Sequence, residues 1–365
     1  MTWRERREVT LPPLAKRSDA ERGLRLIGVI NLSSDTFTLP TKEMRLAMAH
    51  ADVASAGADP TVTALERKVA DLLGKEEALL VPSGTQGTLV AVLAQAARGQ
   101  GVIVESRSYL YISQGAAIAD LTGIHMTPVD GHRGVIHAQH LRGAIGSDVR
   151  MLCLESPHAH AGGIPIPVAL ARKVCAVARR SGLRTHLDGA RLFHAAVALG
   201  VPLRELAAPF DTVMVNLNKG LGAPVGGVVA GGAAFAEEAR RWRKTLGGSI
   251  RQAGVLAAAG IVALDSMMDR LREDHTNARI LAQGLAELQG FHVELDTVQT
   301  NMVFAEIMES NWQAPVLKER LARDGVLCRF VSPRVLRFVT HKDVSREDIE
   351  TALQRIQRVM RGAQY

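Results

Sequence analysis

A lysine followed at once by glycines is the residue of this sequence best suited to chemistry. Lys219 ends an apolar, β-branched run that begins at Thr212, and Gly220 and Gly222 follow it. Lysine is seldom buried without a partner, so its delivery from a strand end into a glycine-rich loop is unusual for a structural residue. An amine in such a pocket, with its pKa lowered, forms Schiff bases with carbonyl groups. On these residues alone, a surface lysine in a turn is an equally good interpretation.

A second chemical feature is the turn Ser83-Gly84-Thr85, which joins an apolar run ending at Val81 to an apolar helical segment. Ser83 is placed to cap that helix, and Gln86 three residues later completes a capping-box pattern. A helix N-terminus that offers free N–H groups and hydroxyls without bulky side chains is an anion site, most naturally for a phosphate.

The elements that position these groups alternate between strands and helices. The sequence predicts strands over residues 78–81, 101–105, 124–129, 151–155, 185–188 and 212–215, and helices over 113–121, 138–145, 167–181 and 190–199. Such repeated units with nearly continuous apolar strands predict a mostly parallel sheet covered on both faces. Ligands of these sheets bind at the carboxyl ends of the strands. The groups expected at that edge are Ser83 to Thr85, Glu105 to Tyr109, Glu155 to His160, Asp188 to Arg191, and Lys219.

The composition bounds the class of protein. The chain has 365 residues, of which 47% are hydrophobic and 22% charged, as in an ordinary globular protein of about two domains. Three widely spaced cysteines, Cys153, Cys175 and Cys328, indicate buried thiols rather than disulfides or a metal site, and they fit a cytoplasmic location. The net charge is +7, but no recognition module accompanies it, so we expect no nucleic-acid binding. The longest apolar run, 253–264, is too short to span a membrane.

The pattern changes after about residue 255. The sequence predicts helices over 252–271, 274–288, 315–323 and 345–361, and strands over 291–295, 301–305 and 335–339. We therefore expect an N-terminal arm (1–40), a large domain (41–255) and a small C-terminal α+β domain (256–365).

One cofactor needs an amine, a carboxylate and a phosphate cradle together: pyridoxal phosphate. Its aldehyde carbon takes the lysine amine, and a carboxylate keeps its pyridine nitrogen protonated, so that the ring withdraws electrons from the substrate Cα. Lys219, Asp188 and the turn at Gly84 supply these groups, and an arginine is suited to bind a substrate carboxylate.

The sequence also resembles the low-specificity L-threonine aldolases of the beta-eliminating lyase family, which are pyridoxal-phosphate enzymes of the aspartate-aminotransferase-like fold type I. The resemblance covers about residues 30–345 in the family's order. It rests on segments 34–38, 59–62, 82–87, 155–158, 161–163, 186–191, 219–226, 251–254 and 337–341.

The resemblance implies a role for each matching residue. Lys219 would form the Schiff base, Asp188 would pair with the pyridine nitrogen, and His158 would be the general base for the β-hydroxyl proton. The remaining residues would bind cofactor or substrate. The phosphate would be held by Ser83, Gly84, Thr85 and Arg251, with Arg251 supplied by a partner subunit, and the substrate carboxylate by Ser34, Arg191 and Arg337. The family also implies a homodimer or homotetramer, cleavage of a β-hydroxy-α-amino acid to glycine and an aldehyde, and no metal.

Three departures from the family pattern surround the expected substrate side chain. Tyr109 stands where the family has a histidine that stacks on the cofactor and also serves catalysis, so the resemblance places Tyr109 among the catalytic and cofactor-binding residues. A phenol can stack on the cofactor, but it does not replace imidazole as a base near neutral pH. Ala56 and Ala58 replace a tyrosine and acidic residues, and Ser156 replaces an asparagine. These changes predict a wider pocket and a bulkier substrate. His160, His186 and His194 are interpreted as structural.

Two alternatives remain. One keeps the cofactor but changes the reaction to β-elimination, racemisation or transaldolase-type C–C bond formation in a biosynthetic pathway. The other is a non-enzymatic binding protein that uses the basic cluster 240–244.

Overall fold

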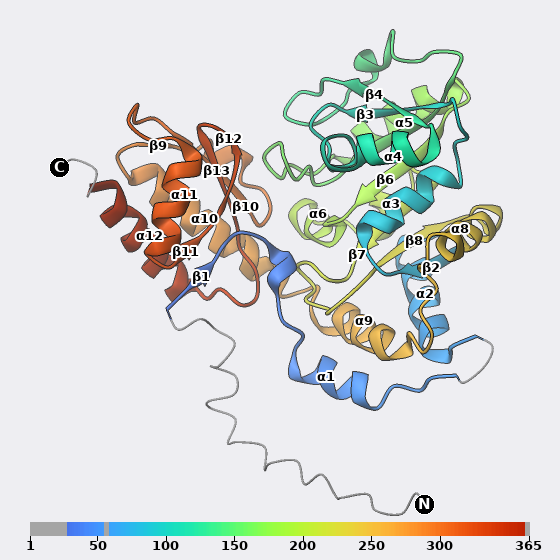
Figure 1. Cartoon of the computed structure of the whole chain (residues 1–365), viewed down its shortest axis with the longest axis horizontal. Coiled ribbons are helices and arrows are strands. Elements are labelled where there is room, and N and C mark those ends of the chain that lie inside the picture. The colour runs from blue at the N-terminus through green and yellow to red at the C-terminus, as the bar shows by residue number, and fades with distance from the viewer. Residues whose placement is uncertain (1–27, 55–57, 362–365) are drawn as a thin grey trace, which may run out of the picture.

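The computed structural model describes residues 28–54 and 58–361, and its centre is a seven-stranded sheet (Figure 1). Most of the predicted N-terminal arm, and Ala56, lie outside the described residues. The strand order is β2-β8-β7-β6-β5-β3-β4. The strands from β7 to β4 are parallel, whereas β8 runs antiparallel to both its neighbours. The predicted α/β class with a mostly parallel sheet is confirmed.

The strands of this large sheet have the following bounds: β2 (Glu77–Val81), β3 (Gly101–Glu105), β4 (His125–Val129), β5 (Val149–Glu155), β6 (Arg184–Gly189), β7 (Thr212–Asn216) and β8 (Gly227–Gly231). Helices cover both faces. One face carries α2 (Pro60–Leu73), α5 (Val168–Arg180), α6 (Leu192–Leu199), α7 (Leu203–Ala207) and α9 (Gly254–Ser266), and the other carries α3 (Gly84–Leu93), α4 (Gly115–Thr122) and α8 (Ala233–Thr245).

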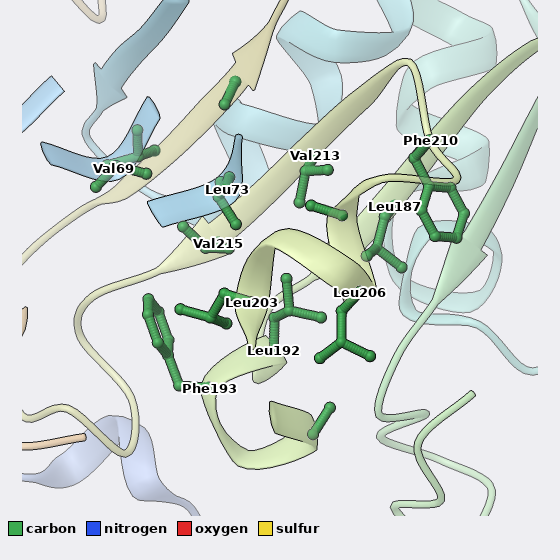
Figure 2. Packing of buried hydrophobic residues seen from close by; sticks show 14 of the residues in the cluster. Val69, Leu73, Leu187, Leu192, Phe193, Leu203, Leu206, Phe210, Val213 and Val215 are labelled. Carbon is green, nitrogen blue, oxygen red and sulfur yellow. The ribbon is translucent and has the colours of Figure 1, made fainter. Parts of the chain in front are cut away.

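The two-residue repeat of the strands assigns side chains to these faces. Val213 and Val215 of β7 join the core of α6 and α7, whereas Met214 between them joins the opposite core with α8. Figure 2 shows Leu192 of α6 and Leu206 of α7 among the buried side chains of the first of these cores. Burial on both faces explains why the strands read as continuous apolar runs.

A smaller α+β part follows in the chain, as predicted. Its antiparallel sheet has the order β12-β13-β10-β9, and a parallel pair joins β1 near the start of the described chain to β11. Its strands are β9 (Phe291–His292), β10 (Met302–Ile307), β12 (Arg329–Ser332) and β13 (Val335–Val339), the pair is β1 (Ile30–Asn31) with β11 (Val326–Leu327), and its helices are α10 (Leu271–Glu287), α11 (Ala314–Arg323) and α12 (Arg346–Arg361). The domain boundaries at residues 40 and 255 stay a prediction.

The N-terminal segment connects the two parts. After β1 the chain forms a short 3-10 turn, η1 (Asp35–Phe37), and then α1 (Lys42–Ala49), which packs beside α9 of the large part (Figure 1). Thr41 caps α1 as predicted, because its side chain accepts a hydrogen bond from Met44 N. Within residues 28–54 and 58–361, no helix is long and apolar enough to cross a membrane.

Several predicted bounds are corrected. The helix expected over 138–145 is only a 3-10 turn, η3 (Ala138–Leu141), because the chain becomes extended at Arg142 and Gly143 has a positive φ of 86°. The helix expected over 252–271 ends at Ser266. The helix expected over 113–121 is α-helical only from Gly115, because a π-helical turn, η2 (Leu110–Gln114), precedes it. The strand expected over 291–295 ends at His292, before the 3-10 turn η4 (Leu295–Thr297).

Candidate active site

Lys219 lies in the loop between β7 and β8, at the carboxyl edge of the parallel strands. The loop is closed at its base by a hydrogen bond from Leu217 N to Gly226 O (3.0 Å) and tightened by one from Gly222 N to Lys219 O (2.8 Å). The Thr38 hydroxyl also donates to Lys219 O (3.2 Å). Gly220 is required here, because a Cβ would collide with the imidazole of His194. Gly220 therefore lets the backbone beside Lys219 pack closely against His194.

The surroundings of Lys219 favour an uncharged amine. Burial lowers the pKa of Lys219 to about 8, and the nearby positive charge of Arg191 acts in the same direction. Asp35 and Asp188 oppose the shift but do not cancel it. Near neutral pH, a larger fraction of this amine is a free nucleophile than in an ordinary lysine.

Asp188 lies at the end of β6, the neighbour of β7, and is only 2% exposed. Its Oδ1 accepts a hydrogen bond from Ala190 N (3.1 Å). Burial raises the pKa of Asp188 to about 6, and the adjacent Glu155, paired with it across β5 and β6, raises it further, whereas Lys219 lowers it. A buried carboxylate of this kind gains most from a cationic partner within reach.

The predicted phosphate turn is a helix N-terminus, as expected. Ser83 caps α3, and its hydroxyl accepts a hydrogen bond from Gln86 N (3.1 Å). The predicted capping box is wrong, because Gln86 Nε2 instead donates to Leu246 O (3.3 Å). Gly84 sits against Asn216 at the end of β7, where any Cβ would collide with the amide. The glycine thus lets the start of α3 lie close against Asn216.

Tyr109 bridges the phosphate turn and β5. Its backbone N donates to Glu155 Oε2 (2.7 Å), and its hydroxyl lies 3.3 Å from Thr85 Oγ1. The ring is 37% exposed and lies parallel to the ring of His160, with an interplanar angle of 6° and 6.5 Å between centroids. The structure therefore brings Tyr109, Thr85 and His160 to one place.

Arg191 is held by a residue that sequence analysis missed. Its Nε and Nη2 donate to Asp35 Oδ2 (2.8 Å) and Oδ1 (2.6 Å) in a fully buried bidentate pair. Burial would raise the pKa of Asp35, but Arg191 outweighs it and holds that pKa well below its usual range. The predicted carboxylate-binding Arg191 thus has its charge balanced from within the chain. The only signal for Asp35 was its place beside Ser34.

Ser34 and Arg337 differ in how many of their side-chain hydrogen bonds are made within the protein. Ser34 caps the 3-10 turn and accepts hydrogen bonds from Thr36 N (3.2 Å) and Thr36 Oγ1 (2.9 Å). Arg337, on β13, is 6% exposed and donates from Nη1 to Ala159 O (3.0 Å). Its buried Nε has no hydrogen-bond partner among the described residues. Burial, together with Arg191, lowers the pKa of Arg337 to about 10. A buried guanidinium so placed is suited to bind an anion.

His158 forms a second pair that sequence analysis missed. Its Nε2 lies 2.9 Å from Oε2 of Glu105, at the end of β3, and both side chains are buried. Burial would lower the pKa of His158, but Glu155 and Glu105 outweigh it and raise it. The spacing of 53 residues between the partners gave no signal in the sequence.

Arg251 lies apart from these groups. It is exposed and lines a cavity of about 700 Å³ together with Pro82 and Gly226, near the back of the phosphate turn. Its predicted contact with the phosphate therefore stays a prediction.

A family model described as "Beta-eliminating lyase" matches residues 31–308. The chain is 39% identical to the low-specificity L-threonine aldolase 1 of Arabidopsis thaliana, over 91% of this chain and 96% of that protein. It is 38% identical to the low specificity L-threonine aldolase of Escherichia coli K12, over 88% and 96%.

Solved structures show the same fold. The threonine aldolase of Leishmania major is 17% identical, with a TM-score of 0.78, covering 90% of this chain and 99% of that one. A structure of SPT with PLP is 19% identical, with a TM-score of 0.73, covering 92% and 88%. The predicted fold type I architecture is confirmed.

The Asp35–Arg191 pair leads to a prediction about stability. We expect Asp35→Asn to lower the free energy of unfolding by about 3 kcal/mol or more, because it leaves a buried guanidinium without its counter-charge. Since the pKa of Asp35 is depressed in the folded state, its contribution is present above the ordinary pKa of 3.8 and is lost as the pH falls further. Denaturant unfolding between pH 3 and 7 measures both effects.

The matched control is Asp324→Asn, which breaks an exposed pair with Arg358. We expect a change of about 1 kcal/mol or less there. Equal losses of unfolding free energy in the two variants would contradict the larger contribution expected of the buried pair.

Proposed function

Because this chain belongs to the family of low-specificity L-threonine aldolases and beta-eliminating lyases, we propose that it is a pyridoxal-phosphate-dependent aldehyde-lyase. It cleaves a β-hydroxy-α-amino acid to glycine and an aldehyde, or runs the reverse aldol addition. The observation that carries the proposal is the pairing of an amine of lowered pKa, Lys219, with a buried carboxylate, Asp188, at adjacent strand ends.

The residues present fit the cofactor. The α3 N-terminus offers N–H groups and the Ser83 and Thr85 hydroxyls to a phosphate, and Gly84 keeps the approach free of a Cβ. Asp188, buried and near the same edge, suits a protonated ring nitrogen. Lys219 supplies the amine that holds the aldehyde carbon. When bound, pyridoxal phosphate accepts the electron pair left at Cα as the Cα–Cβ bond breaks.

The chain's own residues then bind and orient the amino acid. Arg337 holds the substrate carboxylate through the face of its guanidinium that includes the unpartnered Nε. Arg191, fixed by Asp35, and the Ser34 hydroxyl flank that position. Tyr109, whose hydroxyl lies 3.3 Å from that of Thr85, would cover the cofactor. Because Arg337, Arg191 and Ser34 are buried, their surroundings are poor in water and their electrostatic contributions are strengthened.

The substrate has a β-substituent larger than a methyl group. A cavity of about 540 Å³ adjoins His160, and its apolar wall includes Ile112, Ile164, Phe304 and Val335. Cavities of this size accommodate groups well beyond a methyl. Ala58, another departure from the family pattern, is exposed and lines the separate cavity that contains Arg251.

A substrate panel tests the reaction. We expect release of glycine and aldehyde from L-threonine, L-allo-threonine and phenylserine, with the highest kcat/KM for phenylserine. The absorbance of the bound cofactor should disappear in Lys219→Ala, and cleavage with it. No aldehyde from any of the three would overturn the aldolase. Release of ammonia with 2-oxobutanoate from threonine, or with phenylpyruvate from phenylserine, would instead mark β-elimination, the alternative favoured by the lack of an imidazole at Tyr109.

A second test concerns the carboxylate site. We expect Arg337→Gln to weaken glycine binding to the holoenzyme at least tenfold, because hydrogen bonds to charged groups contribute about 1.5–3 kcal/mol. Absorbance titration with glycine measures the dissociation constant. Arg329→Gln is the matched control, since Arg329 faces Arg337 across β12 and β13 but is exposed. Unchanged glycine affinity in the Arg337 variant would assign the carboxylate elsewhere.

The proposal includes a homodimer or homotetramer in which Arg251 reaches the phosphate of the partner subunit. Its support is the exposed position of Arg251 on the cavity behind Pro82. Light scattering on the holoenzyme measures the mass, and a monomer with full activity would contradict it. A cytoplasmic location belongs to the same proposal, supported by three buried free thiols, and recovery in a secreted fraction would refute it.

A further inference from the structure

The imidazole of His158 is poorly placed to take a proton from a substrate. Its Nε2 is bonded to Glu105 (2.9 Å), and its Nδ1 accepts a hydrogen bond from the backbone N of His160 (3.4 Å). The side chain has no exposed surface. Both ring nitrogens are therefore engaged within the protein, and the ring instead supports the loop that follows it.

That loop is held from several sides. Ala159 N donates to Glu155 Oε1 (2.8 Å), and Ala159 O accepts from Arg337 Nη1 (3.0 Å). Gly163 N closes the loop on His158 O (2.9 Å). The residue between these anchors is His160, so its backbone is tied directly to the side chains that surround the cofactor and carboxylate sites.

His160 presents its ring to the site. The ring lies parallel to that of Tyr109, with 6.5 Å between centroids, and His160 lines a cavity of about 540 Å³. Its Nδ1 is buried and has no hydrogen-bond partner within residues 28–54 and 58–361. An unpartnered polar atom in such a position is costly unless a ligand or a reaction uses it.

The charge state of His160 suits a proton acceptor. Burial lowers the pKa of His160 to about 4, with Arg337, His158 and Arg191 acting in the same direction and Glu155 opposing them. The imidazole is therefore neutral near pH 7. The other polar side chains that share its cavity or ring contact are Tyr109, Arg107, Arg133, His292, Glu294, Thr297, Glu306 and Ser332.

We propose that His160 is the catalytic imidazole that takes the proton from the substrate β-hydroxyl, and that His158 is a positioning residue for it. The inference rests on the proposed function. The O–H bond breaks, its proton moves to a ring nitrogen of His160, and its electron pair forms the aldehyde C=O. The Cα–Cβ bond breaks at the same time, and its electron pair stays with Cα. The proton held by His160 then balances the protonation of Cα that yields glycine.

A single histidine at position 109 would both stack on the cofactor and transfer the proton. In this arrangement the two tasks belong to two rings, those of Tyr109 and His160. Tyr109 keeps the stacking surface and the contact with Thr85, whereas the proton transfer passes to the parallel imidazole. The site thus retains a base although residue 109 is a phenol, whose ordinary pKa is near 10.

The experiment uses the holoenzyme and the variant His160→Gln. We expect kcat for aldehyde release to fall roughly 100-fold or more, as for loss of a general base. The cofactor absorbance and the dissociation constant of glycine should stay within about twofold. His50→Gln, at an exposed position on the end of α1, should keep the wild-type kcat. A wild-type kcat in His160→Gln would overturn the inference while leaving the proposed function intact.

The acid limb of the pH profile separates the two histidines. If His160 is the base, kcat of the wild type stays high below pH 6.5 and declines only toward pH 4, because the neutral ring is the active form. If His158 is the base, kcat declines already above 6.5, because the pKa of His158 is raised. A decline above 6.5 that persists in His160→Gln and disappears in His158→Gln would refute the proposal.

A spectroscopic readout is independent of turnover. In holoenzyme with ¹⁵N-labelled histidine, we expect the ring signal that is missing from His160→Gln to titrate near pH 4 and to shift when glycine is added. A signal insensitive to glycine would overturn the placement of His160 beside the substrate. If the wild type cleaves no β-hydroxy-α-amino acid, the proposed function fails, and this inference fails with it.

Discussion

The buried ion pair between Asp35 and Arg191 is the interaction on which the rest of the site depends. It places one positive charge, balanced by one negative charge, in a buried position beside the end of β6. Arg191 helps lower the pKa of Lys219, and Asp35 opposes that effect. Arg191 also lowers the pKa of Arg337 and of His160. Removing either member would leave an unbalanced buried charge close to Lys219, Arg337 and His160.

The sheet brings the other functional groups together through its two-residue repeat. Glu155 and Asp188 are register partners on adjacent parallel strands, so their side chains project from the same face. Met214, the partner of Asp188 on β7, belongs to the core beneath α3 and α8. The acids are therefore on the face that carries the N-terminus of α3, which is where a phosphate and a ring nitrogen of one small molecule have to be bound.

The sequence was sufficient for the groups whose partners are local. Lys219 among glycines, Asp188 after a buried strand and Ser83 at a helix start are each recognisable from their neighbours, and the parallel sheet follows from the repeated apolar runs. The sequence did not predict the hydrogen-bond partners of Asp35, Glu105 and Glu155, because those partners lie 156, 53 and 46 residues away. Strand β8 was not predicted from the sequence either, because Gly227 to Gly231 is a short apolar run bounded by glycines. The role of His160 depends on loop contacts that no residue spacing expresses.

The segment from β1 to α1 ties the smaller core to the reactive lysine. Leu32 O accepts a hydrogen bond from Val339 N of β13, Asp35 binds Arg191, and the Thr38 hydroxyl reaches Lys219 O. These three anchors lie within seven residues of backbone, whose reach is fixed by covalent geometry. A rotation of the small sheet relative to the large one would therefore pull on this short span. The segment therefore links the positions of Arg191 and of the Lys219 loop to the position of the sheet that carries Arg337.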